Sequence, residues 1–460
     1  MKHSMLVLTL AATAAACGDP GVDLGKDDGF DDVYHIVTDI SPTGTHDLDI
    51  LFVIDNSGSM AEEQAALLGA MSADFVGVLE DEFGVRPNLH VAIASTDVGA
   101  GPFNISGCTG TGDNGVFQSD PRNTGCTPPD GTFLSDILPE DGPREVNYTG
   151  TFDEAFGCVA RLGIDGCGFE QPLESMRLAL DGTNPENAGF LRADAMLAIV
   201  FLTDEDDCSV FDPQMFDTSQ NSVDDPLGPL SSFRCFEFGV QCEEDTPRTE
   251  GVRDNCIPRE DSEYMTSVSE YVEFVQGLKS DPTKIVVTGI TGPSSPVIVG
   301  ADMNGNPKLE PACDSPGGTA DAAVRLSSFI GSFPGRAVAQ SICGDGSLSA
   351  ELRYASSVIA GAANQSPCII GPLEDIDQDA AGLQYDCRVY DAENRGTANE
   401  IRTPIRACDN SDTSLPCHRL TGDSAMCGHT ESTLRVEVTR DAGDIPDTHV
   451  LVRCRVPNQQ

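Results

Sequence analysis

The near-continuous apolar run "LDILFVID" at residues 48–55 is the feature that most constrains the fold. A run of this kind is typical of a parallel β-strand that is covered on both faces. Residues 60–84 follow with apolar side chains at helical spacing, and Gly84 is a stop signal. The alternation of strand-like and helix-like segments continues to residue 364. We therefore predict an α/β fold: a doubly wound, mostly parallel sheet with helices on both sides.

Two long segments interrupt this alternation, at about 99–147 and about 208–261. Both are rich in glycine, proline and aspartate, and both contain cysteines. Loops of this length inside a compact domain need covalent staples or a function of their own. Further along, the pattern changes to alternating strands with more cysteines. We expect a domain over 47–366 that carries the two insertions, and a small cysteine-rich β unit over 367–460.

The N-terminal residues 1–17 have the layout of a secretory signal. Lys2 precedes an apolar run that is too short to span a bilayer, and small residues stand directly before Cys17. This pattern resembles the signal peptide of bacterial lipoproteins. The resemblance implies that Cys17 is lipidated and anchored in the outer membrane, at the cell surface; the alternative is an ordinary signal peptide with a cysteine nearby by chance. Residues 18–46 are rich in Gly, Asp and Pro, and we predict an acidic tether there.

The cysteine count agrees with export. The chain has 17 cysteines, so a lipidated Cys17 leaves 16, an even number. An exported chain with this many cysteines is expected to be oxidised, with up to eight disulfide bonds. No C-x-x-C pair occurs, which argues against zinc ribbons and thioredoxin-like chemistry.

The net charge of the chain argues against one class of partner. Asp and Glu number 74 against 27 Lys and Arg, and the formal net charge is -47. Such a surface offers no counter-charge to phosphate groups, so we expect no nucleic acid partner. The same surface attracts cations.

A candidate cation site follows the first strand. Asp55, Ser57 and Ser59 stand at spacings of two, and Gly58 allows a tight turn between them. In an open α/β sheet, ligands bind where parallel strands end. One carboxylate and two hydroxyls are hard oxygen donors that suit Mg²⁺, with Mn²⁺ and Ca²⁺ as the other candidates. The alternative is that Asp55 or Asn56 only caps the next helix.

These residues, with the strand before and the helix after them, resemble a von Willebrand factor A (VWA) domain and its metal-ion-dependent adhesion site. The resemblance implies a third ligand after the central strand, and Asp204 directly follows "AMLAIVFLT". It also implies a threonine in a second loop, where this chain has Glu170. Either Glu170 binds the metal in place of the threonine, or it only lies in a first helical turn, favoured by the helix dipole.

The sequence contains no nucleophile elbow and no phosphate-binding loop, so we expect no enzymatic activity. The predicted function is a surface-anchored, divalent-cation-dependent module for adhesion or protein binding. Its partner would be a protein or another macromolecule whose acidic group completes the coordination of the ion. The alternatives are a metal-assisted hydrolase and a structural envelope protein in which the ion only stabilises the fold.

Overall fold

The structure is a computed structural model, and it describes residues 35–40 and 45–456 apart from short gaps. The gaps are 123–124, 140–141, 245, 317, 345, 365–366, 370–372, 377–383, 396–398, 410–413, 425–426, 428–429, 431 and 442–447. The predicted signal peptide with Cys17 lies outside the described residues, as does the tether up to residue 34. The prediction of a mixed α/β chain is confirmed. No helix among the described residues combines the length and apolar character needed to cross a membrane.

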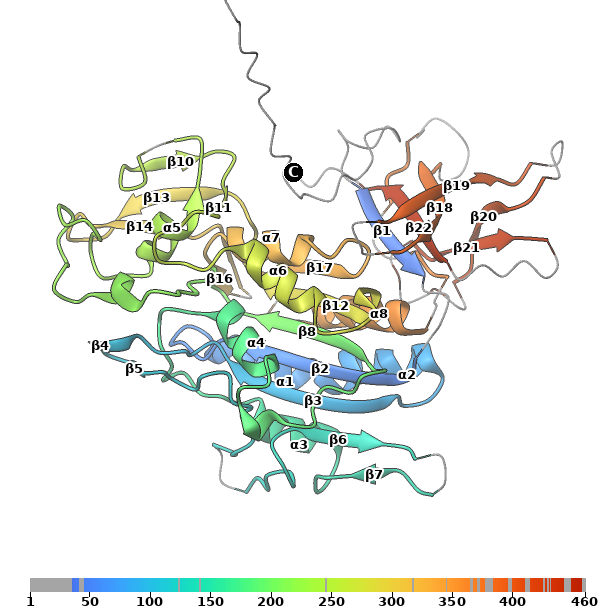
Figure 1. The fold of residues 1–460 in the computed structure, drawn as a ribbon, viewed down its shortest axis with the longest axis horizontal. Helices are drawn as coiled ribbons and strands as arrows, with labels where there is room; N and C mark the ends of the chain where they lie inside the picture. Colours follow the sequence, from blue (N-terminus) through green and yellow to red (C-terminus); the bar gives the residue numbers. More distant parts are fainter. Residues whose placement is uncertain are drawn as a thin grey trace, which may run out of the picture.

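Seven strands form a central sheet in the order β17-β12-β8-β2-β3-β6-β7 (Figure 1). The strands from β17 to β3 run parallel, and β6 and β7 continue the sheet in antiparallel fashion. Every residue of β8 is buried, as the predicted apolar run requires. The bounds of the strands are β2 (Asp47–Ile54), β3 (Asn88–Ser95), β6 (Leu134–Ile137), β7 (Glu145–Val146), β8 (Met196–Leu202), β12 (Ile285–Thr291) and β17 (Ala337–Ser341).

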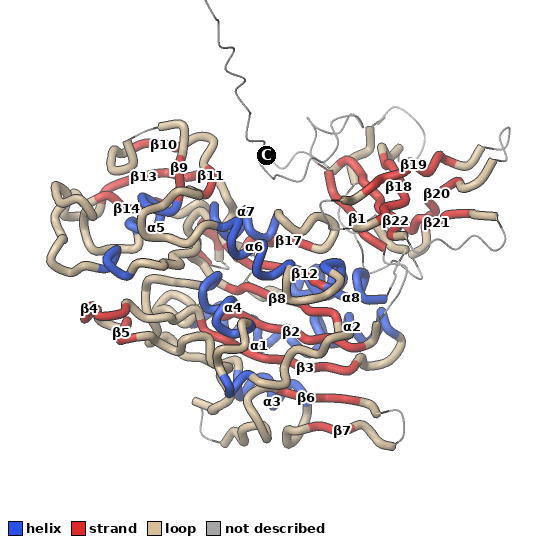
Figure 2. Tube along the Cα trace, in the orientation of Figure 1, coloured by secondary structure: helices blue, strands red, loops and turns tan. Residues whose placement is uncertain are grey.

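Helices pack on both faces of this sheet (Figure 2). The side chains of β2 alternate between the two cores: Ile50 and Phe52 enter one, and Leu51 and Val53 the other. The first core is covered by α1 (Ala61–Ala70), the π-helix η1 (Met71–Val76), α2 (Gly77–Phe83), α3 (Phe152–Val159) and α8 (Ser349–Asn364). The second is covered by α4 (Pro172–Leu180), α6 (Val268–Gln276) and α7 (Val324–Gly331).

All sixteen cysteines after Cys17 form disulfide bonds, as predicted. Two bonds tie the first insertion to the segment around α3, and two lie within the second insertion. The pairs are Cys108–Cys167, Cys126–Cys158, Cys208–Cys235, Cys242–Cys256, Cys313–Cys343, Cys368–Cys427, Cys387–Cys454 and Cys408–Cys417.

The insertions are not only loops. Strands β6 and β7 of the first insertion extend the central sheet. A third insertion, between β12 and α7, contains two β-hairpins that were not predicted from the sequence. The short elements of these regions are β4 (Gly101–Ile105), β5 (Cys108–Gly110), η2 (Pro185–Asn187), η3 (Pro213–Phe216), α5 (Phe233–Gly239), β9 (Val240–Gln241), β10 (Gly251–Arg253), β11 (Ile257–Pro258), η4 (Pro282–Lys284), β13 (Val297–Ala301), β14 (Pro307–Glu310), β15 (Cys313–Ser315) and β16 (Gly318–Ala320).

The C-terminal unit is a six-stranded sheet whose edge strand comes from the N-terminal part of the chain. The order is β1-β22-β18-β19-β20-β21, and β1 pairs antiparallel with β22. The prediction that all of 18–46 is a tether is therefore wrong for residues 35–40, because β1 satisfies the backbone edge of β22. The strands are β1 (His35–Ile40), β18 (Cys387–Glu393), β19 (Ile401–Ala407), β20 (Cys417–Gly422), β21 (Leu434–Thr439) and β22 (His449–Arg455).

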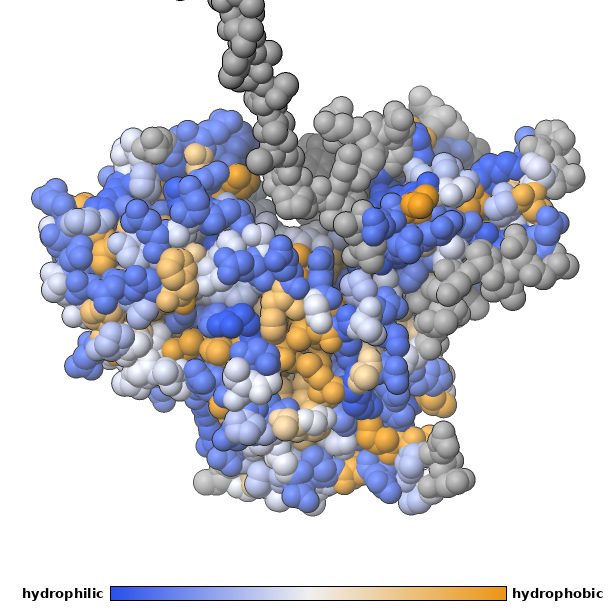
Figure 3. Space-filling model, viewed as in Figure 1, coloured by the Kyte–Doolittle hydropathy of each residue, from blue (hydrophilic) through white to orange (hydrophobic). Residues whose placement is uncertain are grey.

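The two large sheets meet at the amino edge of the central sheet. Asp39 of β1 pairs at 3.4 Å with Arg336, the residue just before β17. Figure 1 shows the C-terminal sheet on the right, away from the end toward which β8 points. Figure 3 shows a mainly hydrophilic surface over the insertions and the C-terminal sheet, with apolar side chains gathered near the middle of this face. The carboxyl edge of the central sheet lies at the other end, where the two insertions follow β3 and β8.

Candidate metal centre

The candidate site lies at the carboxyl edge of the central sheet, where β2 and β8 end side by side. The two strands are parallel, with Ile54 opposite Leu202. The N–H of Asp55 donates to the carbonyl of Leu202 at 2.9 Å. Asp55 and Asp204 therefore leave the sheet at the same edge, as predicted from the sequence.

The loop between β2 and α1 is a compact turn that holds the three predicted donors. One carboxylate oxygen of Asp55 accepts from the N–H of Ser57 at 2.7 Å, and the Ser57 and Ser59 hydroxyl oxygens are 3.1 Å apart. The other Asp55 oxygen accepts from the hydroxyl of Thr203 at 2.7 Å. Helix α1 begins after Met60 without a side-chain cap, so the helix-cap alternative is wrong. Asp55 is buried and Ser59 is exposed, so the donors open to solvent at Ser59.

Glu170 lies before helix α4 rather than within it. The helix begins at Pro172 with Gln171 as its N-cap, so the alternative of a first-turn residue is wrong. The carboxyl group is buried and accepts from the hydroxyl of Thr96, while its Oε1 has no hydrogen-bond partner. Burial, and then the nearby Asp55 carboxylate, raises the pKa of Glu170 well above its usual range. Glu170 therefore lies beside Asp55, and its binding of a metal stays a prediction.

The four acidic residues after β8 divide into a structural pair and a site pair. Asp206 accepts from two backbone N–H groups at the start of α7, at 2.9 and 3.0 Å. Asp207 forms a buried ion pair with Arg325 at 3.0 Å. The Asp204 carboxylate instead raises the pKa of Asp55 and of Glu205. Two of the four acids therefore hold the fold together, and two belong to the candidate site.

Burial raises the pKa of every carboxyl group of the site, and a neighbouring carboxylate raises the pKa of Asp55, Glu170 and Glu205 further. Burial, and then the Asp204 carboxylate, raises the pKa of Asp55 to about 6. Burial, and then Asp55, raises the pKa of Glu205 well above its usual range. Burial also raises the pKa of Asp204, although a hydrogen bond from Ser59 opposes it. None of these groups has an ion pair with a described Lys or Arg side chain, so a bound cation would supply the missing positive charge.

The residues present fit a hard divalent cation. Carboxylate and hydroxyl oxygens are the donors that such ions prefer. Two buried oxygens, Glu170 Oε1 and Asp204 Oδ1, have no hydrogen-bond partner, which is uncommon for buried acceptors. Over the described ranges, no three His, Cys, Asp or Glu side chains are grouped closely enough to hold a metal ion by themselves. A cation bound at this edge would have to use the hydroxyl groups as well: Asp55, Ser57, Ser59 and Asp204 would hold it, with Glu170 beside them and water completing its coordination.

Sequence reasoning missed three polar residues of this edge. Thr96 and Thr203 each stand directly after a parallel strand, β3 and β8, and each donates its hydroxyl to a site carboxylate. The position just after such a strand is the signal that could have found them. Glu205 lies in a run of four acids whose roles cannot be separated without the tertiary contacts.

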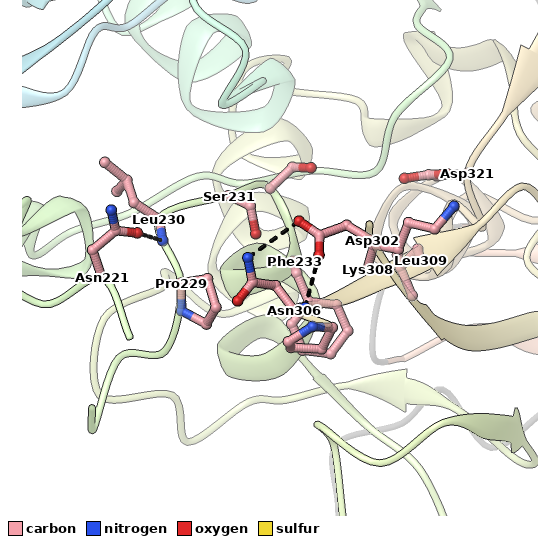
Figure 4. Close-up of a pocket in the computed structure, with 12 residues that line it drawn as sticks. Asn221, Pro229, Leu230, Ser231, Phe233, Asp302, Asn306, Lys308, Leu309 and Asp321 are labelled. Carbon is pink, nitrogen blue, oxygen red and sulfur yellow. Dashed lines mark hydrogen bonds between the residues drawn. The ribbon is translucent and has the colours of Figure 1, made fainter. Parts of the chain in front are cut away.

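A polar cavity of about 260 Å³ opens close to this edge, between the second insertion and the β13–β14 hairpin (Figure 4). Asp321 lines it, and the N–H of Asp321 donates to the carbonyl of Asp204 at 2.9 Å. Figure 4 shows the Asp302 carboxylate bonded to Asn306 within the hairpin turn, where the side-chain contact is 3.1 Å. The cavity therefore offers room for polar groups of a ligand beside the candidate metal centre.

Comparisons with known proteins give a weak likeness. No protein-family model and no curated protein matches the chain. The solved structures that match include a von Willebrand factor type A protein from Catenulispora acidiphila, at 9% identity over 92% of this chain and 66% of that chain, with a TM-score of 0.28. They also include the pilus adhesin SpaC from Lactobacillus rhamnosus GG, at 9% identity over 91% of this chain and 40% of that chain, with a TM-score of 0.30. The pilus adhesin RrgA from Streptococcus pneumoniae matches at 11% identity over 92% of this chain and 58% of that chain, with a TM-score of 0.26. At these TM-scores the likeness carries no argument about function.

Proposed function

We propose that this protein is a surface-anchored module for adhesion or protein binding that acts through a divalent cation. In this proposal the central sheet is a doubly wound, VWA-like sheet, and its carboxyl edge holds Mg²⁺, with Mn²⁺ and Ca²⁺ as the other candidates. A protein or another macromolecule supplies an acidic oxygen to the open side of the ion. The chain itself is not an enzyme.

The observation that carries the proposal is the pairing of buried, unneutralised carboxylates with an exposed hydroxyl. Asp55 and Asp204 are buried, and no described Lys or Arg side chain pairs with either of them, while Ser59 opens the same loop to solvent. A cation held there would be anchored from the protein side and reachable from outside. That is the arrangement that a ligand-completed coordination sphere needs.

The position of β1 supports the proposed orientation. The predicted tether leads from Cys17 into β1, which lies in the C-terminal sheet and pairs with the amino edge through Asp39 and Arg336. A lipid on Cys17 would therefore hold the amino edge toward the membrane. The carboxyl edge with the candidate site would face away from it, toward a partner.

The burial of Glu170 favours a second candidate function, in which the ion only stabilises the fold. Glu170 is completely buried and already accepts a hydrogen bond from Thr96. A carboxylate supplied from inside the protein would make the ion less electrophilic and less able to recruit an acidic partner. The two candidates differ in whether a partner binds.

A capture experiment separates these candidates. The intact protein is cross-linked to its neighbours at the cell surface in Mg²⁺ or in EDTA, and the same is done with Asp55→Ala. The proposal expects partners to be captured only by the wild type and only in Mg²⁺. If the wild type in EDTA and Asp55→Ala in Mg²⁺ capture as much partner as the wild type in Mg²⁺, the cation-dependent role is wrong. If Mg²⁺ binds but no partner is captured, the ion only stabilises the fold.

The proposed anchor has its own test. Mass spectrometry of the mature N-terminus is expected to find a lipid on Cys17, and the protein is expected to fractionate with the outer membrane. A mature chain that keeps residues before Cys17, or one that fractionates without membrane, would contradict the lipid anchor.

A further inference from the structure

A second cavity, of about 310 Å³, lies within the second insertion and shares no residue with the candidate metal centre. Its walls come from α5, β9, β10 and the segment after β11, which lie together in Figure 2. The disulfide bond between Cys242 and Cys256 ties two of these segments to each other. Two arginines line the cavity, Arg253 and Arg259, and among its described lining residues Glu244 is the only acid.

Arg253 is buried and keeps a donor without an acceptor. It is the last residue of β10 and is 6% exposed. Its terminal nitrogens donate to backbone carbonyls, among them that of Thr246 at 2.9 Å, but its Nε has no hydrogen-bond partner. Arg234 of α5 offers a contrast, because it is also buried among carbonyls and its Nε donates to Pro229 at 3.1 Å. Arg234 is satisfied within the fold, whereas Arg253 has a buried N–H group that needs an acceptor.

Arg259 adds a guanidinium group with several donors to the same cavity. The residue follows β11 and is half-buried, and its backbone N–H donates to the carbonyl of Gly239 at 2.8 Å. One terminal nitrogen donates to the carbonyl of Val240 at 3.3 Å. A guanidinium group has five N–H donors. Most of the donors of Arg259 therefore have no acceptor in the part of the protein that the structure describes.

The acids around the cavity do not neutralise these two arginines. In the described part of the chain, no Asp or Glu lies within ion-pair distance of either one. Glu244 accepts from a backbone N–H group at 3.0 Å, and Glu237 of α5 is already paired with Arg248 at 2.9 Å. Asp and Glu outnumber Lys and Arg by 74 to 27 in this chain, so an unpaired pair of arginines is unusual in it. The lining of the cavity carries a net positive charge.

We propose that this cavity binds an oxyanion, which is a carboxylate, sulfate or phosphate group of a ligand. The planar guanidinium group matches such anions with two parallel N–H···O bonds, and it is more weakly hydrated than an ammonium group. Arg259 supplies donors for the anion, and Arg253 supplies a second positive charge that the fold holds in place. The site needs no divalent cation, so it does not depend on the proposed function.

Isothermal titration calorimetry of the full chain in EDTA tests this site, with sulfate, inorganic phosphate and succinate as the probes. At least one probe is expected to bind the wild type. Arg259→Gln should weaken this binding at least about tenfold, because charge-assisted hydrogen bonds are lost. Arg161→Gln is the matched control, since it removes the same charge from an exposed arginine outside the cavity and should leave the affinity unchanged. Circular dichroism melts show whether each variant is folded.

Each outcome decides for or against the anion site. A wild type that binds none of the three probes at millimolar concentration overturns it. A folded Arg259→Gln that binds as tightly as the wild type also overturns it, and so does an equal loss in Arg161→Gln, which would assign the binding to the overall charge. A loss confined to Arg259→Gln supports the site. The probe that then binds most tightly tells whether the natural ligand presents a carboxylate, a sulfate or a phosphate group.

Discussion

Two buried carboxylates at opposite edges of the central sheet have opposite surroundings. At the amino edge, Asp39 contacts Arg395 at 2.9 Å, Arg336 at 3.4 Å and His449 at 2.7 Å. Burial alone would raise the pKa of Asp39, but Arg395, His449 and Arg336 outweigh it and lower the pKa to about 2. At the carboxyl edge, burial and then Asp204 raise the pKa of Asp55 to about 6.

The difference shows that burial by itself does not decide what a carboxylate does. Both groups are removed from water, and the neighbouring charges decide the sign. Arginine side chains of the protein already balance the charge of Asp39, so this ion pair serves as a joint between the two large sheets. No Lys or Arg side chain in the described part of the chain pairs with Asp55, so this carboxylate is suited to bind a cation. The two edges therefore make opposite predictions for mutation, pH and added metal.

The largest effect is expected at the joint. Asp39→Ala leaves Arg395 and Arg336 buried without their shared anion, and removing one partner of a buried pair costs about 3–5 kcal/mol of unfolding free energy. Guanidinium denaturation at neutral pH, with the disulfides intact, measures this loss. The control is Asp81→Ala, an exposed carboxylate on α2 that should change the free energy by less than about 0.5 kcal/mol. Equal midpoints for the two variants would contradict the joint.

The pH dependence of the two edges should have opposite signs. The pKa of Asp39 is lowered to about 2, so its stabilisation is present above about pH 4 and is lost as the pH falls toward 2. The pKa of Asp55 is raised to about 6, so without metal the folded state loses stability as the pH rises from about 4 to 6. The size of the Asp55 effect is about 3 kcal/mol. In EDTA, Asp55→Asn should make this decline shallower between pH 4 and 6, while Glu170, Glu205 and Asp204, whose pKa values are also raised, keep the rest of it. A slope that Asp55→Asn leaves unchanged would count against the prediction.

Added metal should stabilise only through the carboxyl edge. A ligand that binds the folded state alone adds about 2.7 kcal/mol at a hundred times its Kd. Mg²⁺ should therefore raise the Tm of the wild type and of Asp39→Ala, because the joint lies at the other edge. Asp55→Ala should show no response. A metal response that survives in Asp55→Ala would place the cation elsewhere in the chain.

The parts of the fold that the sequence predicted are those set by local patterns. The apolar runs at β2 and β8 are strands because they are buried on both faces, and Asp55 follows from the end of β2. Strand β1 escaped prediction because six residues among acidic neighbours carry little local signal, and its pairing with β22 joins distant parts of the chain.

The site could be predicted only in part for the same reason. The position of Asp204 at the sheet edge was predicted because Asp204 directly follows a strand, but the three acidic residues after it look the same in sequence. Asp207 is structural because of Arg325, which lies 118 residues away. The local sequence cannot reveal the role of a residue when that role depends on a partner far along the chain.

The smallest expected effect concerns Glu170, and it separates the two candidate functions. Glu170→Thr removes a buried carboxylate beside Asp55 and should weaken Mg²⁺ binding about tenfold, the size typical for groups around a metal. The same change makes the ion more electrophilic, so capture of a poly-glutamate peptide in Mg²⁺ should strengthen. Glu62→Thr, on the exposed face of α1, is the control and should change neither quantity beyond a few tenths of a kcal/mol, the size of a dipole effect. Weaker Mg²⁺ binding without any gain in peptide capture would favour an ion that only stabilises the fold. Unchanged Mg²⁺ affinity would remove Glu170 from the site.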